Sequence, residues 1–365
     1  MNKLTGVIPN EISTLYDMRH INLFANELTS FIPIGIGNLT YLELLDVEEN
    51  RLEGSIFTAE VLSLLSLIGI RGSSNNFTGT IPSDIAILTK LEQIWVATNA
   101  YTGTIPTQLG LLTSMQTLFL YENAFSGAIP SEIGQMTNLT QIRLDNNVLN
   151  GSIPNTFYNL TTLATARLES NTLTGEIATL LGELLSLDDL RLSNNMISGT
   201  VPTEIGNLFS LENLILNDMT ISGIIPTEIG NLLSLGFLDM SNNVGVSGPI
   251  PSQLFDLPDL RIVYFSNCSL TGTIPSNFAS PPLLRDLFLD GNFLFGSIPE
   301  ATPGQLPLLS EFLVMGNYIN GTMPQSICAL RDNATGVLED LWSDCGGAAP
   351  RIVCPFPDCC NRCFG

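Results

Sequence analysis

The sequence is poor in positive charge. Lysine and arginine together number 13, against 35 aspartate and glutamate residues, which gives a formal net charge of −22 at pH 7. The lysines are Lys3 and Lys90 alone. A molecule with that field repels the phosphate backbone of nucleic acids and the anionic surface of a membrane. The composition therefore argues against nucleic acid as a partner.

Long apolar runs are missing as well. The most apolar stretch, residues 61–70, is interrupted by serines, and a membrane-spanning helix needs about 18 apolar residues. The first residues have neither the basic segment nor the long apolar stretch of a secretory signal peptide. We therefore expect no membrane span within this sequence.

Catalytic motifs are also scarce. The sequence has a single histidine, His20, and no G-x-S-x-G, no phosphate-binding glycine loop and no H-x-x-H motif. Neighbouring acidic residues such as Glu48 and Glu49 are expected on an open face, where nothing excludes water or raises a pKa. We predict that the protein is not an enzyme, holds no metal ion and needs no cofactor.

What the sequence has in abundance is repetition. An asparagine recurs about every 24 residues, and an Ile-Pro dipeptide or its equivalent follows each time. Met219 and Cys268 take the asparagine position in two registers. The asparagines are Asn2, Asn26, Asn50, Asn75, Asn99, Asn123, Asn147, Asn171, Asn195, Asn243, Asn292 and Asn317. Self-similarity at such a period is typical of a solenoid, in which stacked units share one core.

The repeated unit reads L-x-x-L-x-L-x-x-N-x-L-x-G-x-I-P-x-x-[IL]-G-x-L, as in residues 187–208. This unit resembles the leucine-rich repeat, and its G-x-I-P segment is similar to the plant-type subclass. The resemblance implies an α/β solenoid, a right-handed superhelix with a concave parallel β-sheet of about 13 strands. It also implies extracellular recognition, as in receptor ectodomains or secreted inhibitors of wall-degrading hydrolases.

Each repeat position has a physical reason. The L-x-L alternation predicts a short strand with one buried face, and the asparagine amide can pair backbone groups where that strand turns away. Methionine cannot make those bonds, so we predict looser packing near Met219 unless Asn217 or Asp218 substitutes. Cys268 is expected to be a buried thiol in place of the asparagine.

The two ends of the repeat array differ from its middle. The first unit lacks its strand and no polar cap precedes Met1, so we expect a fragment whose N-terminal cap and signal peptide belong upstream; a self-capping start is the alternative. Residues 1–325 are expected to form the solenoid and residues 326–365 a cysteine-rich C-terminal cap. Residues 337–342 place three apolar side chains on one face of a predicted helix.

Six of the seven cysteines lie in this C-terminal segment: Cys328, Cys345, Cys354, Cys359, Cys360 and Cys363. We predict that disulfides pin the cap, with fifteen pairings open. The alternative is a metal site at Cys360-x-x-Cys363. The segment CPFPDCCNRC resembles the cysteine tails of leucine-rich repeat proteins from unicellular algae such as diatoms.

Disulfides imply an oxidising compartment, so we expect an extracellular or cell-surface protein. N-x-[ST] sequons give candidate glycosylation sites. We expect three of them to share one repeat position on the outer side, namely Asn38, Asn138 and Asn159. The other candidates are Asn150, Asn320 and Asn333.

The strand register predicts a candidate ligand site. The residue between the second and third leucines of each unit should point out of the concave sheet, and these residues should align on successive strands. Trp95 and Phe119 would then be neighbours, with Tyr121 beside them. Arginines follow in three consecutive units. The candidate ligand-binding residues are Trp95, Phe119, Tyr121, Arg143, Arg167, Arg191, Asp145 and Glu169; Tyr264 and Phe288 form a possible second contact.

Alternatives remain for these residues. Asp145, Glu169 and Asp189 could neutralise the arginines in an ion-pair network on a solvated face. A separate column of hydroxyl residues follows the repeat glycines and could order water as an ice- or crystal-binding face does; β-edge propensity alone explains it equally. Its members are Ser55, Thr80, Thr104, Ser152, Thr200, Thr273, Ser297 and Thr322.

The sequence therefore predicts an extracellular recognition module that binds a protein, peptide or glycan ligand through the concave face. The alternative is a structural or adhesion component of a cell coat, held by homo-association.

Overall fold

The computed structural model describes residues 3–302, 304–331, 337–345, 351–355, 359–360 and 362–363. Asn2 and the sequon Asn333 therefore lie outside the described residues. The chain divides into two compact units, Met1–Thr174 (unit 1) and Gly175–Gly365 (unit 2), and each is described by itself. No helix among the described residues is long and apolar enough to cross a membrane.

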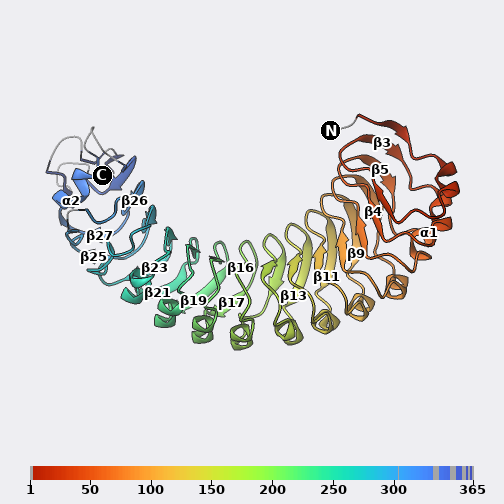
Figure 1. Ribbon diagram of the computed structural model, residues 1–365. Helices are drawn as coiled ribbons and strands as arrows, with labels where there is room; N and C mark the ends of the chain where they lie inside the picture. Colours follow the sequence, from red (N-terminus) through yellow and green to blue (C-terminus); the bar gives the residue numbers. More distant parts are fainter. Residues whose placement is uncertain are drawn as a thin grey trace. The chain divides into compact units, whose positions relative to one another are not determined.

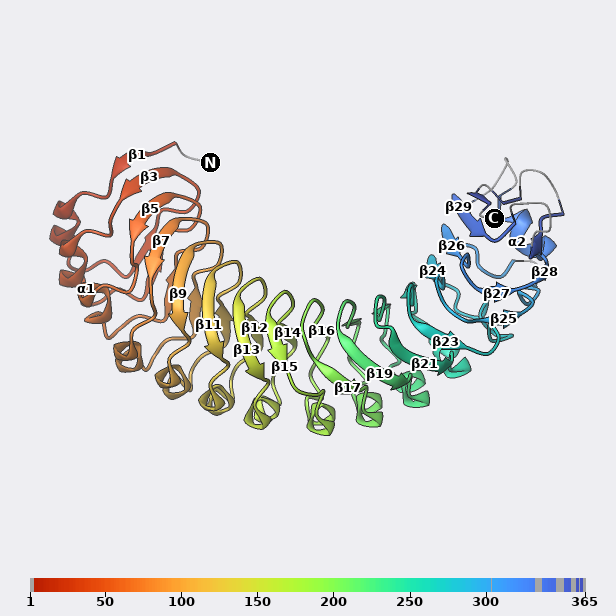
Figure 2. The same cartoon turned by 180° about the vertical axis from the view of Figure 1, so that it is seen from behind.

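Unit 1 has a parallel main sheet along one side and short helices along the other (Figures 1 and 2). Each main strand of unit 1 is three residues long, and its central residue is buried, as the L-x-L pattern predicts, while most flanking residues are more exposed. The main-sheet strands of unit 1 are β2 (His20–Asn22), β4 (Leu44–Asp46), β6 (Gly69–Arg71), β8 (Gln93–Trp95), β10 (Thr117–Phe119), β12 (Gln141–Arg143) and β14 (Thr165–Arg167).

A second series of parallel strands, which the repeat pattern did not predict, follows the repeat asparagines in unit 1. These strands are β1 (Thr5–Val7), β3 (Glu27–Ser30), β5 (Arg51–Gly54), β7 (Asn76–Gly79), β9 (Ala100–Thr104), β11 (Ala124–Ala128), β13 (Val148–Ser152) and β15 (Thr172–Thr174). The helical turns that follow are 3₁₀ helices, opened by the repeat proline, whose φ is already fixed. They are η1 (Asn10–Thr14), η2 (Ile34–Asn38), η3 (Ser83–Ile87), η4 (Thr107–Leu111), η5 (Ser131–Gln135) and η6 (Asn155–Asn159), with α1 (Ala59–Leu62) in one repeat.

Unit 2 repeats the same plan. Its main sheet contains β16 (Asp189–Arg191), β18 (Asn213–Ile215), β20 (Phe237–Asp239), β22 (Ile262–Tyr264), β24 (Asp286–Phe288), β26 (Glu311–Leu313), β29 (Asp340–Ser343) and β31 (Arg362–Cys363). Its other strands are β17 (Ser198–Thr200), β19 (Thr220–Ile224), β21 (Gly245–Pro249), β23 (Ser269–Thr271), β25 (Phe295–Gly296), β27 (Tyr318–Ile319), β28 (Gly321–Thr322) and β30 (Ile352–Val353). Its helices are η7 (Thr179–Glu183), η8 (Thr203–Asn207), η9 (Thr227–Asn231), η10 (Ser252–Asp256) and α2 (Gln325–Ala329). Among the described residues, β2 to β26 supply the thirteen main-sheet strands expected of the repeats, and the architecture is an α/β solenoid.

The repeat asparagines form hydrogen bonds with the backbone of the preceding repeat. The Nδ2 group of Asn147 donates to the carbonyl oxygens of Leu120 and Leu144 at 3.0 and 3.1 Å, and its Oδ1 accepts from the Phe125 N–H at 2.9 Å. The same pattern recurs at Asn50. The buried backbone groups at the bend are thereby paired, as predicted.

The two exceptions behave differently. The thiol of Cys268 donates to the Met240 carbonyl at 3.3 Å, so it replaces one of the missing amide bonds as expected. Met219 has no oxygen to accept the Ile197 N–H, and β17 begins one residue later, at Ser198. The side chains of Asn217 and Asp218 bond to each other at 2.6 Å and do not substitute.

The C-terminal segment is held by three disulfides among the described residues: Cys328–Cys359, Cys345–Cys363 and Cys354–Cys360. The prediction of a helix over residues 337–342 is wrong, because Asp340–Ser343 forms strand β29 of the main sheet. Glu311, Phe312 and Leu313 pair in register with the first three residues of β29. The segment buries Leu341 by extending the sheet, and strand alternation then places Trp342 on the opposite, outward side.

Candidate functional site

The outward column of the main sheet in unit 1 is aligned as the repeat register predicts. Asn22, Asp46, Arg71, Trp95, Phe119, Arg143 and Arg167 are paired in register on successive strands. Arg71 lies in the repeat whose strand register the sequence left blurred, and the structure places it directly beside Trp95.

Side chains of this column form a continuous stack with Tyr121, which lies two residues after Phe119. We name this stack the aromatic run: Arg71, Trp95, Phe119, Tyr121 and Arg143. The Trp95 and Phe119 rings stack with centroids 5.3 Å apart, and Phe119 and Tyr121 are tilted at 6.3 Å. A guanidinium covers each end, that of Arg71 4.0 Å from the Trp95 ring and that of Arg143 3.7 Å from the Tyr121 ring. Cation–π contacts of this kind fix the orientation of both partners.

The arginines of the aromatic run are held by acceptors on their own strands or on neighbouring ones. Arg143 donates through Nε and one terminal nitrogen to the two carboxylate oxygens of Asp145, both at 3.2 Å. Arg71 donates to the Gln93 side chain and lies 3.7 Å from the Asp46 carboxylate. Ion pairing therefore accounts for much of the positive charge at this face.

The carboxyl groups of Asp46 and Glu48, near Arg71 at one end of the aromatic run, lie in a partly water-excluded environment. Burial raises the pKa of Asp46, although the Glu48 backbone N–H and Arg71 oppose the shift. Burial also raises the pKa of Glu48, against a hydrogen bond from Ser73. The expectation that nothing raises a pKa at Glu48 is therefore wrong, because this side chain is only partly exposed.

The remaining predicted residues lie in different places. Arg167 pairs in register with Arg143, and both Arg167 and Glu169 are engaged with partners. Arg191 belongs to unit 2, where it bonds to Asp189 at 2.8 Å. The structure thus brings Trp95, Phe119, Tyr121, Arg143 and Asp145 together. Arg191 is the last residue of β16, in unit 2.

Unit 2 carries its own aromatic pair on the outward column. Tyr264 and Phe288 stack with centroids 4.3 Å apart, and Phe237 meets Tyr264 edge-on at 5.6 Å. Trp342 continues this column on β29. Sequence reasoning missed Trp342 because the segment was assigned to a helix. Burial raises the pKa of Tyr264, with Asp286 and Glu311 adding to the shift.

The hydroxyl column lies at or just after the ends of the second series of strands, and its threonines have a packing role. A Cβ at Gly103 would lie 2.8 Å from the Thr80 γ-methyl group, and one at Gly127 would lie 2.9 Å from that of Thr104. Each threonine methyl therefore rests on the next repeat's glycine, whose φ of 78° or 76° excludes most side chains.

The candidate glycosylation sites within the described residues are exposed: Asn38, Asn138, Asn150, Asn159 and Asn320. The expectation that three share one repeat position is wrong. Asn38 and Asn159 are the last residues of η2 and η6, whereas Asn138 comes three residues after the end of η5.

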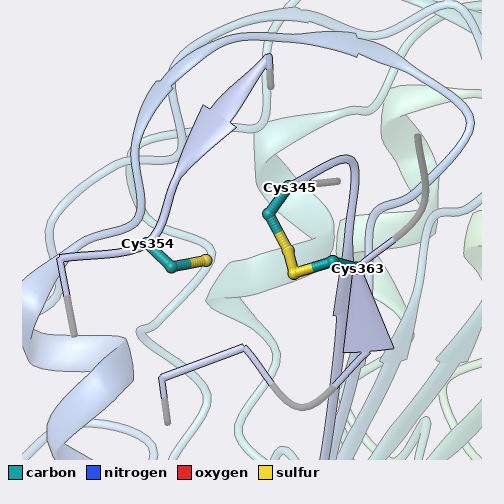
Figure 3. Close-up of side chains that lie close together, drawn as sticks. All are labelled: Cys345, Cys354 and Cys363. Carbon is teal, nitrogen blue, oxygen red and sulfur yellow. A yellow bond between two sulfur atoms is a disulfide. The ribbon is translucent and has the colours of Figure 1, made fainter. Parts of the chain in front are cut away.

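Three cysteine sulfurs lie close enough together for a metal site, but they are bonded in disulfides. Ligand atoms of Cys345, Cys354 and Cys363 lie within 4.8 Å of one another. Figure 3 shows Cys345 and Cys363 joined by a disulfide, with the Cys354 sulfur nearby. Cys354 is itself bonded to Cys360. Since metals bind thiolates, these oxidised sulfurs are not available as ligands.

Comparisons with known proteins agree with this architecture. Residues 138–160, 186–208 and 259–281 match the family model described as Leucine Rich Repeat. Receptor-like protein 31 of Arabidopsis thaliana is 28% identical over 92 residues, which is 25% of this chain and 11% of that protein.

Two solved structures resemble the chain over most of its length. A TDR receptor has a TM-score of 0.87 and 34% identity, covering 91% of this chain and 57% of that one. The plant peptide hormone receptor RGFR1, in complex with RGF2, has a TM-score of 0.81 and 28% identity, covering 97% of this chain and 58% of that one. The chain thus spans less than two thirds of the length of these relatives. Its repeats and its relatives support a protein of the plant leucine-rich repeat type.

Proposed function

We propose that the protein is a non-enzymatic recognition module that binds an extended peptide over the main-sheet face of unit 1. The aromatic run is the observation that carries this proposal. From Arg71 to Arg143 it crosses three strand spacings of about 4.8 Å, or about 14 Å in all. A peptide segment of about four extended residues has that length.

The chemistry of the face favours a peptide with apolar or aromatic side chains. Stacked rings offer rigid apolar area at little entropic cost, and the Trp95 indole N–H already donates to Thr117 at 2.7 Å. Arg143 and Arg167 would contribute charge-assisted hydrogen bonds at one end, next to Asp145 and Glu169. One relative with a solved structure is a peptide hormone receptor, which supports the same ligand class.

The setting of this function is also a proposal. Disulfides in the C-terminal segment and receptor-like relatives favour an extracellular location. Residues 1–325 would act as the recognition solenoid and residues 326–365 as its cap. The exposed sequons, such as Asn150 and Asn320, would carry glycans. The likeness of the tail to algal proteins stays a prediction.

An array of synthetic peptides and oligosaccharides, incubated with labelled protein, tests the proposal. We expect peptide hits that Phe119→Ser weakens by about tenfold or more, because the substitution opens the middle of the stack. Phe288→Ser, an equivalent change on unit 2, serves as the matched control and leaves those hits unchanged. Hits confined to oligosaccharides, or peptide hits indifferent to Phe119→Ser, would overturn it.

A further inference from the structure

Unit 2 has a row of exposed apolar side chains on successive repeats, seven residues after the proline position of each. We name Leu185, Phe209 and Leu233 the apolar ridge; their exposed fractions are 58%, 57% and 57%. Unit 1 has a single exposed aromatic residue at this position, Tyr16, and threonine in five other repeats: Thr40, Thr89, Thr113, Thr137 and Thr161. Three aligned large apolar groups facing solvent mark an interaction surface, since exposure of this kind stabilises nothing within the chain.

A cavity of about 340 Å³ adjoins the end of the apolar ridge at Ser234, the residue after Leu233. The cavity exists because Gly236 has no side chain. The equivalent positions in the preceding and following repeats carry the long side chains of Glu212 and Arg261. A Cβ at Gly236 would meet no atom closer than 3.5 Å. Phe237 and Ile262 supply apolar lining. The exposed Glu212 and Asp259 supply two carboxylates, against one guanidinium from Arg261.

The charge of this region specifies the partner. Residues 175–262 include eleven acidic residues and two basic ones, Arg191, which is paired with Asp189, and Arg261, which lines the cavity. A cationic partner is therefore attracted to the apolar ridge, and a second copy of a chain with net charge −22 is repelled.

The sequons avoid the same region. Asn159 and Asn267 are consecutive N-x-[ST] sites, so the intervening repeats, including the apolar ridge, contain none. In unit 1 the sequon Asn138 directly follows Thr137, which occupies the ridge position. Any glycan on Asn138 would cover that position in unit 1, whereas the corresponding surface of unit 2 stays open.

We infer that the apolar ridge and the Gly236 cavity form a docking surface for a partner polypeptide that presents leucine-like side chains next to lysine or arginine. A cationic side chain enters the cavity toward Glu212 and Asp259, and apolar neighbours cover Phe209 and Leu233. This surface is separate from the aromatic run of unit 1 and does not rest on the proposed function.

Fluorescence anisotropy with three labelled synthetic peptides tests the docking surface. One peptide alternates leucine with lysine, the second leucine with glutamate, and the third serine with lysine. We expect the leucine–lysine peptide to bind about tenfold or more tightly than the other two, with an affinity that falls as salt is added. Phe209→Ser/Leu233→Ser and the cavity-filling Gly236→Gln should each weaken that binding by about tenfold.

Leu111→Ser is the matched control, because Leu111 is equally exposed, at 57%, but lies in unit 1. Circular dichroism verifies that each variant folds. If the double variant does not fold, Gly236→Gln still tests the docking surface. Equal binding of the three peptides, or unchanged binding to both unit 2 variants, overturns the inference. So does a concentration-dependent dimer that the double variant abolishes, since the occupant would then be a second copy.

Discussion

At the scale of single residues, the repeat consensus encodes backbone geometry more than side-chain chemistry. The residue before each repeat asparagine has a left-handed φ, for example 52° at Thr98 and 54° at Asn146. Such a residue is strained unless its surroundings stabilise the conformation. The hydrogen bonds of the neighbouring asparagine amide stabilise it here. The role of the asparagine followed from its hydrogen-bonding capacity. The left-handed residue was predictable only in part, because Asn, Asp and Gly, which favour this conformation, occupy the position in some repeats, whereas Thr98, Glu122 and Ser170 give no such signal.

Cys268 tests the residue-level account. Burial raises the pKa of its thiol to about 11, so the native protein keeps it protonated and unreactive. We expect iodoacetamide at about pH 8 to leave the native chain unlabelled and to modify one thiol per chain in urea without reductant. Mass spectrometry measures both. Labelling of seven thiols in urea would contradict the disulfides.

At the scale of the strand, the register of the main sheet was predictable, and the neighbours of each outward side chain followed from it. Trp95 and Phe119 stack because parallel strands place equivalent residues about 4.8 Å apart. The ion pairs could not be predicted to the atom. Asp145 and Glu169 occupy the same repeat position, and only side-chain packing decides that Arg143 bonds to Asp145 while it covers Tyr121.

The contact between threonine methyls and glycines is a testable feature of the second strand series. Gly103 and Gly151 occupy the same repeat position with φ of 78° and 73°. A Cβ would lie 2.8 Å from the Thr80 γ-methyl at Gly103 but 3.5 Å from the Ala128 Cβ at Gly151. Both Gly→Ala variants should therefore lose stability from backbone strain, and Gly103→Ala should lose about 1 kcal/mol more.

Urea unfolding measures the difference between these two variants. Thr80→Ala should remove the extra loss of Gly103→Ala, because it deletes the clashing methyl group. Equal losses in the two glycine variants, or no rescue by Thr80→Ala, would show that the methyl contact does not matter.

At the scale of the whole molecule, acidity sets the response to pH. Burial is the largest cause of the raised pKa of Asp46, Glu48, Asp239, Asp286 and Glu311. A carboxyl group with a raised folded-state pKa binds its proton more tightly in the folded chain. Its contribution to stability is therefore present at low pH and is lost as pH rises through the folded pKa.

We expect the free energy of unfolding to be higher at about pH 5 than at about pH 8, and to fall again above about pH 9, where the unfolded chain releases the Cys268 proton first. Glu311→Gln should flatten the acid part of the curve, because Asp286 and Asp340 add to the upward shift at Glu311. Urea titrations across this pH range provide the curve. A stability that climbs from pH 5 to pH 8 would refute the account.

The overall architecture was the most predictable level, because a period repeated across most of the chain leaves few alternatives for burying its leucines. The ends were less predictable. Residues 337–342 contain one short apolar pattern that fits a helix or a strand, and pairing with β26 decides between them. The disulfide partners of Cys328 and Cys354 likewise depend on folding of the segment and not on spacing.

The most direct test of the central claim uses the two tryptophans, Trp95 in the aromatic run and Trp342 on β29. Trp342→Phe leaves Trp95 as the sole reporter, and Trp95→Phe leaves Trp342. Each variant is titrated with the peptide selected on the array while its indole emission is recorded. The account predicts a saturating change from Trp95 and a flat signal from Trp342. A response confined to Trp342 would place the ligand elsewhere and contradict it.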